Sequence, residues 1–261
     1  MGERGAISST VWCSNRKEYH LAMAISVKGA LPPRTPLYIA LSGLMALIAA
    51  VGFWPTYYGP LVRLTLAQPP LIHVHAMVFT GWLALFSAQV VFAATGRIRW
   101  HLRLGRVGIA YGVVLVIVGL TTAVWRAAAL PRGGQAEGLL YVTVVDMLVF
   151  ASFFGAAIWF RRRPDVHKKL MTIAATTLLV AAVGRMSFLP APPLGLAVIF
   201  LVWSSPVLLA AAYDWRHGRS VHPVYLIGLT GYAFRVWSEP LALTAPWAAF
   251  ATVVFRMASF P

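Results

Sequence analysis

The chain alternates long apolar stretches with short segments rich in arginine and lysine. A run of about 18 or more apolar residues is long enough, as a helix, to cross the hydrocarbon core of a bilayer. The chain contains several such runs, which predicts an all-α integral membrane bundle of about seven transmembrane helices. The predicted spans cover residues 37–54, 70–94, 105–128, 138–160, 169–189, 194–213 and 223–238.

Composition supports the membrane assignment and indicates which kinds of molecule the chain contacts. Only 11% of the side chains are charged, whereas a soluble domain usually carries about 25%. The net charge of +15 comes mostly from residues between the apolar runs, which favours contact with the lipid bilayer and its anionic headgroups over nucleic acid. Cys13 is the only cysteine, which excludes an intrachain disulfide, an iron–sulfur cluster and a cysteine-based zinc site.

The basic residues also predict an orientation. Sixteen of the 22 lysines and arginines fall in the N-terminal segment or after the second, fourth and sixth spans, whereas the opposite side has three, namely Arg63, Arg126 and Arg132. The positive-inside rule therefore predicts a multi-pass protein of the bacterial inner (plasma) membrane with a cytoplasmic N-terminus. The four lysines, which are predicted to lie outside the spans and so to exclude a retinal Schiff base, are Lys17, Lys28, Lys168 and Lys169.

The two ends of the chain differ from the central part. Residues 1–35 are polar and mixed, which predicts a disordered cytoplasmic segment, although translation starting at Met23 is an open alternative. Residues 36–240 form the predicted bundle. Residues 241–261 are apolar but short, which is typical of an interfacial or re-entrant segment, and whether residues 241–256 form a membrane-embedded helix is left open.

Three polar residues on different predicted spans share one depth near the outer surface, namely His75, Asp146 and Arg185. Charged groups inside a span usually face the bundle interior and pair with one another, so Asp146 and Arg185 are predicted to form an ion pair. The pair is interpreted either as a lock between two helices or as part of a site with His75. Snorkelling of the charges to the surface is the remaining alternative.

Two histidines open the second span but point to different sides of the helix. His73 continues into small residues suited to close packing, whereas His75 continues into an aromatic stripe that ends at Gln89. That stripe could line a flat cofactor or quinone pocket, or be ordinary core. We predict His75 and Gln89 as cofactor-binding residues, and His75 with His73 as candidate metal ligands, because imidazole suits copper, zinc and iron.

Two further histidines, His101 and His167, stand at the cytoplasmic starts of the third and fifth spans, each among basic residues. They are predicted to bind a cofactor, and the alternative is an anchor at the lipid headgroups.

These residues carry a resemblance to a known family. Over about residues 36–240 the chain resembles a bacterial family of uncharacterised multi-pass membrane proteins. The matching pieces are FWPTYYGPL at 53–61, HVHAMVFTGW at 73–82, HLRLGR at 101–106, RRRPDVHKKLM at 161–171, Gln89 and Arg185. More distantly, the H-x-x-L-G-R and H-K-K-L-M patterns are similar to cytochrome-b-type membrane bundles, which hold haem between histidines of neighbouring helices. That resemblance implies His101 and His167 as a bis-histidine pair. The outer layer departs from it, because the fourth span offers Asp146 instead of a second histidine.

Two interpretations of function follow. The first is a redox or electron-transfer protein that binds haem b or a quinone through membrane-embedded histidines. The second is a non-catalytic assembly factor, transporter or sensor with a structural or transient metal-binding histidine cluster. Whether the chain is an enzyme stays open, and the sequence singles out no catalytic residue, protein partner or oligomeric state.

Overall fold

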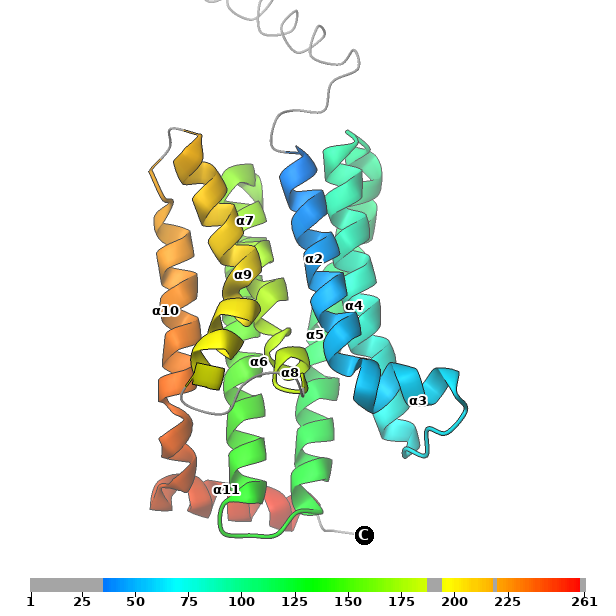
Figure 1. Cartoon of the computed structure of the whole chain (residues 1–261), viewed down its shortest axis with the longest axis vertical. Coiled ribbons are helices and arrows are strands. Elements are labelled where there is room, and N and C mark those ends of the chain that lie inside the picture. Colours follow the sequence, from blue (N-terminus) through cyan, green and yellow to red (C-terminus); the bar gives the residue numbers. More distant parts are fainter. Residues whose placement is uncertain (1–34, 187–193, 218–219, 259–261) are drawn as a thin grey trace, which may run out of the picture.

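The computed structural model describes residues 35–186, 194–217 and 220–258, and these residues form helices with no strand among them. Figure 1 shows most of the helices running side by side along the long axis. The predicted cytoplasmic segment and the alternative start at Met23 lie outside the described residues. The helices, in chain order, are α2 Thr35–Phe53, η1 Trp54–Tyr58, α3 Gly59–Val62, α4 Pro70–Ala94, α5 Ile98–Ala128, α6 Gln135–Trp159, η2 Phe160–Arg162, α7 Pro164–Thr177, α8 Val180–Val183, α9 Leu194–Arg216, α10 Pro223–Trp237, η3 Glu239–Leu243 and α11 Ala245–Ala258.

The helix lengths confirm the predicted class of protein. Six helical segments of the described residues are long and apolar enough to cross a membrane, and a seventh is reached if α10–η3 and the bent α11 count as one span. The all-α membrane bundle of about seven helices is therefore confirmed. Proline occupies the first position of α4, α7 and α10, where its missing N–H breaks no helical hydrogen bond.

The centre of the molecule is a four-helix bundle of α4, α5, α6 and α7, which alternate in direction. Its core holds Trp82 of α4, Leu115 of α5 and Phe150 and Phe154 of α6, all buried. The Trp82 indole meets the rings of Phe150 and Phe154 edge to face, with centroids 5.3 and 5.2 Å apart. Helices α2, α9 and α10 pack beside this bundle around a second core.

The first span does not stop where the apolar run stops. Helix α2 ends at Phe53 and continues as the π-helical turn η1, after which α3 leads toward α4. The hydroxyl of Tyr57 lies 3.0 Å from Nδ1 of His73, and the hydroxyl of Tyr58 lies 2.7 Å from that of Thr80. The stretch at residues 53–61 therefore ties the end of α2 to the start of α4.

The fifth span differs from its prediction. A single span over 169–189 is expected, and Pro164–Val183 is long and apolar enough to be one span, but inside it α7 ends at Thr177 and the one-turn helix α8 begins at Val180. Side chains of other helices donate additional hydrogen bonds to carbonyls of α7 before the break: Trp203 Nε1 to Thr176 O at 2.9 Å, and the Tyr232 hydroxyl to Ile173 O at 2.6 Å. Because backbone groups without water need such partners, the stacked Trp203 and Tyr232 rings stabilise the interruption.

The C-terminal helix crosses one end of the bundle, as the red helix at the bottom of Figure 1 shows. It is bent by 81° from the preceding α10–η3 segment. It packs on the end of α5 and the start of α6 through Ala127, Ala136, Leu140, Ala251 and Phe255. Residues 245–258 are therefore helical, while their placement at the membrane interface stays a prediction.

Candidate functional site

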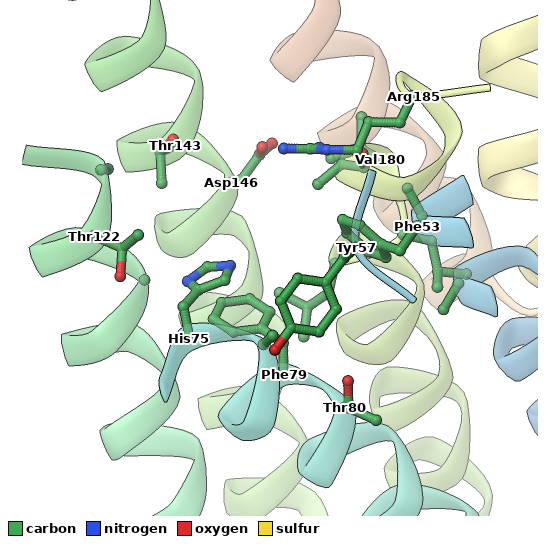
Figure 2. Close-up of a pocket in the computed structure, with 18 of the residues that line it drawn as sticks. Phe53, Tyr57, His75, Phe79, Thr80, Thr122, Thr143, Asp146, Val180 and Arg185 are labelled. Atoms are coloured by element: carbon green, nitrogen blue, oxygen red, sulfur yellow. The ribbon is translucent and has the colours of Figure 1, made fainter. Parts of the chain in front are cut away.

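A cavity of about 560 Å³ lies where α2, η1, α4, α5, α6 and the α7–α8 break meet. We call the end of the four-helix bundle that contains it the cavity end. Its volume falls in the range of about 300–1,000 Å³ that is usual for ligand sites. Figure 2 shows side chains of these elements facing this space.

Three polar atoms of the lining residues are buried and have no hydrogen-bond partner in the described part of the chain. They are Nδ1 of His75, Nε1 of Trp82 and Oγ1 of Thr122. More than about nine in ten buried polar groups in proteins have a partner, so three exceptions around one cavity are unusual. These atoms have almost no accessible surface, so a ligand or water held in the cavity satisfies them only after the side chains turn toward it.

Aromatic rings form part of the wall. The His75 imidazole stacks on Phe79, with ring centroids 4.2 Å apart and planes 23° apart. Phe53 and Tyr57, delivered by the end of α2 and by η1, also line the cavity, as Figure 2 shows. The site therefore combines flat apolar surfaces with uncommitted polar atoms.

The structure corrects the predicted ion pair. Asp146 lines the cavity, but its carboxylate accepts from Nε of Arg235 at 2.8 Å, and Arg235 also pairs with Glu239. Figure 2 shows Arg185 extended toward Asp146, yet among the described residues no nitrogen–oxygen contact within 4.0 Å joins them. Arg235 lies 89 residues from Asp146, and only the packing of α10 against α6 brings it into reach.

Two arginines at the cavity have no carboxylate partner among the described residues. The Arg185 guanidinium lies 5.1 Å from the centre of the Phe53 ring and donates to the carbonyl of Ala181. Arg126, at the end of α5, also lines the cavity. Because Arg235 neutralises Asp146, these two cations give the site a positive character.

His73 and His75 do not converge on one site. Nδ1 of His73 is engaged by Tyr57, and His73 is absent from the cavity lining, whereas His75 faces the cavity. No group of three or more histidine, cysteine, aspartate or glutamate side chains within the described ranges could hold a metal ion. The predicted metal ligands His75 and His73 thus lack a further ligand of these types.

The other predicted histidines meet at the opposite end of the bundle. His101, at the start of α5, and His167, at the start of α7, have ring centroids 6.4 Å apart and planes 85° apart. Their Nδ1 atoms lie 3.2 Å from the carbonyl oxygen of Gln89 and 2.8 Å from that of Ala157. We call this the paired-histidine end.

Gln89 belongs to the paired-histidine end and not to the cavity. It is 14 residues after His75, about 21 Å along the helix at about 1.5 Å per residue, and its side-chain amide packs against Gly105. Its Oε1 atom is buried without a partner. The predicted stripe from His75 to Gln89 therefore spans two separate sites.

Lys169 is a functional candidate that the sequence analysis places wrongly. It is grouped with the loop lysines although it stands at the first position of the predicted fifth span, and in the structure it sits inside α7 and is 2% exposed. Its ammonium lies 2.5 Å from Asp165 and 3.4 Å from Asp214 of α9. The available signal was Asp214, an acidic residue near the end of an otherwise apolar span.

The surface of α5 beside His101 is packed against side chains of α4, which bears on the predicted haem site. The imidazoles themselves are suitable, but the macrocycle needs a slot beside them. The glycines that could provide it, Gly105 and Gly108 on α5, are covered by the side chains of Gln89 and Leu85, which lie 3.2 and 3.3 Å from the position of an added Cβ. The cavity at the other end offers only one histidine, His75.

Comparisons with known proteins add no assignment, since no protein family, curated protein or solved structure matches the chain.

Proposed function

We propose that this membrane protein binds a quinone headgroup in the cavity and takes part in electron transfer through it. The observation that carries the proposal is the set of three unpartnered buried polar atoms around an aromatic-walled cavity, from His75, Trp82 and Thr122. A quinone is a flat ring with two carbonyl oxygens, which need hydrogen-bond donors. Indole and hydroxyl groups are such donors, and so is an imidazole in the tautomer that carries hydrogen on Nδ1.

The positive character of the cavity supports the same ligand class. Reduction of a quinone adds two electrons and two protons, and it passes through anionic forms when electrons arrive first. The uncompensated charges of Arg126 and Arg185 favour those forms over the neutral quinone. The stacked His75 and Phe79 rings offer a flat face for the headgroup.

The test is equilibrium dialysis of the detergent-purified chain against menadione, a small naphthoquinone. We expect Thr122→Val and His75→Ala each to raise the dissociation constant by about tenfold, equivalent to about 1.4 kcal/mol for one lost hydrogen bond. Thr121→Val is the matched control, because Thr121 is exposed and does not line the cavity. Equal binding by wild type and both cavity variants would overturn the proposal.

A second candidate, a transporter for a small organic anion, is favoured by one observation. The α7–α8 break contributes Leu178 and Leu179 to the cavity wall, and interrupted helices line the substrate sites of many transporters. The same dialysis separates the two functions. Benzoate should leave menadione binding unchanged if the site selects quinones, whereas displacement by benzoate would favour an anion site.

We further propose that the paired-histidine end faces the cytoplasm, in a bacterial inner membrane. The support is the excess of arginine and lysine in the loops at that end. A chain with Cys13→Ser and Arg162→Cys should react with a membrane-impermeant maleimide only after the cells are opened. Labelling of intact spheroplasts at residue 162 would reverse the orientation.

A further inference from the structure

We propose that His101 and His167 form a two-coordinate site for a monovalent copper ion, and not a haem site. This inference concerns the end of the bundle opposite the cavity and does not depend on the proposed quinone site. It starts from the packing of Gln89 and Leu85 against Gly105 and Gly108, on the helix that carries His101.

The hydrogen bonds of His101 and His167 determine which ring nitrogen of each imidazole can bind a metal ion. A carbonyl oxygen can only accept, so the Nδ1 atoms that face Gln89 O and Ala157 O carry the hydrogen. In each neutral imidazole the lone pair then lies on Nε2. This arrangement is typical of metal-binding histidines, whose second nitrogen donates to a carbonyl that fixes the ring orientation.

The spacing of the two rings matches a shared ion. A metal–imidazole bond is about 2.0–2.1 Å, and a ring nitrogen lies about 1 Å from the ring centre. Two imidazoles whose binding nitrogens point at one ion therefore place their centres about 6 Å apart, and the observed separation of 6.4 Å is close to this value. The 85° angle between the planes is compatible with linear coordination, because each ring can turn about its metal bond.

The number of ligands selects the kind of ion. No third histidine, cysteine, aspartate or glutamate of the described segments joins the pair. Structural zinc takes four ligands, and calcium takes six to eight oxygens. Copper accepts imidazole readily, and its monovalent d¹⁰ form is stable with two ligands in a line.

The surrounding positive charge opposes any bound cation, and it opposes a monovalent ion less than a divalent one. Basic residues crowd the sequence around both histidines, namely Arg97, Arg99, Arg103, Arg106, Arg161, Arg162, Arg163 and Lys168. Coulomb repulsion grows in proportion to the charge of the bound ion, so a divalent cation meets twice the penalty. The buried Oε1 of Gln89, which has no partner, places a partial negative charge in the same region.

The competing explanation is purely structural, because each bond also ties the start of one helix to the end of the preceding one. His217 provides the control for this role. Its Nδ1 lies 2.8 Å from the carbonyl of Tyr213, and its ring stacks on Tyr213 and not on another histidine. His217→Ala therefore removes an imidazole–carbonyl hydrogen bond at the end of a single helix, α9, and controls for the loss of such a bond but not for the loss of a tie between helices.

The experiment titrates the full chain carrying Cys13→Ser, because a thiolate also binds Cu(I). The protein is purified in detergent and kept reduced, and Cu(I) is added in competition with a chromogenic chelator. Wild type and His217→Ala should each bind one equivalent. His101→Ala and His167→Ala should each lose more than about 100-fold in affinity, because even outer partners of metal ligands contribute about 10–100-fold. Equal affinity in wild type and both pair variants would overturn the site.

A measurement on wild type alone decides the matter if the variants fold poorly. X-ray absorption at the copper edge should show two nitrogen neighbours at about 2 Å and the edge feature of linear Cu(I). Three or more ligands, or no bound copper, would overturn the proposal. A haem Soret band that disappears in His101→Ala would also overturn it, in favour of a haem site.

Discussion

The two ends of the four-helix bundle use histidine in opposite ways. At the paired-histidine end, His101 and His167 each direct Nδ1 at a backbone carbonyl and lie next to each other. At the cavity end, His75 keeps a buried Nδ1 with no partner beside an open volume. The first arrangement orients a ring, whereas the second leaves a buried polar atom without a partner beside the cavity.

The difference has an energetic basis. A buried polar group without a partner costs about 1–3 kcal/mol, whereas a satisfied hydrogen bond contributes about 0.5–1.5 kcal/mol. The cavity end carries this cost at His75, Trp82 and Thr122 together. Folding alone gives no reason to keep the three there, and their position around one cavity supports a binding role.

The largest effect is expected at the Asp146–Arg235 pair, which is the satisfied polar contact inside the cavity end. Arg235→Gln leaves the Asp146 carboxylate without its cation, and breaking a buried pair typically costs about 3–5 kcal/mol. The double change with Asp146→Asn should recover part of that loss. Thermal unfolding of the detergent-purified variants measures both.

The control for this pair is Arg185→Gln, since Arg185 has no contact with Asp146 within 4.0 Å. We expect it to change stability less than Arg235→Gln does. Strictly additive losses for Asp146→Asn and Arg235→Gln, with strong coupling between Asp146 and Arg185, would restore the pairing expected from sequence.

A smaller effect tests how the wall of the cavity is held. Gly52 of α2 lies against Ala182 of α8, and an added methyl group would collide with the carbonyl of Ala182. Gly52→Ala should destabilise the protein by about 1–3 kcal/mol, the usual cost of overpacking, and should weaken menadione binding. Gly43→Ala on the same helix meets open space, so equal losses in the two variants would mean that the close approach does not matter.

The smallest effect separates the two ends directly. His101→Ala removes a formed hydrogen bond and should lower stability by about 1 kcal/mol. Thr122→Val removes a hydroxyl that has no partner, so stability should stay unchanged or rise slightly while menadione binding weakens. A marked loss of stability in Thr122→Val would show that its hydroxyl serves the fold.

Part of the site could be predicted from the sequence. The opposite directions of His73 and His75 follow from helical periodicity, and the structure places His75 at the cavity and His73 on Tyr57. The partner of Asp146 could not be predicted, because depth alone does not show which helices touch. Arg235 and Arg185 both lie near the depth of Asp146 in the bundle. The packing of α10 on α6 makes Arg235 its partner.

The sequence by itself determined the all-α membrane bundle, because a bilayer requires long apolar helices and each such helix appears in the sequence as an uninterrupted apolar run. Only the tertiary structure decided the break between α7 and α8, the burial of Lys169 and the grouping of the polar residues into two sites. Trp203 and Tyr232 show why. They satisfy carbonyls on another helix 27 and 59 residues away, and hydropathy along one chain segment carries no information about such a partner.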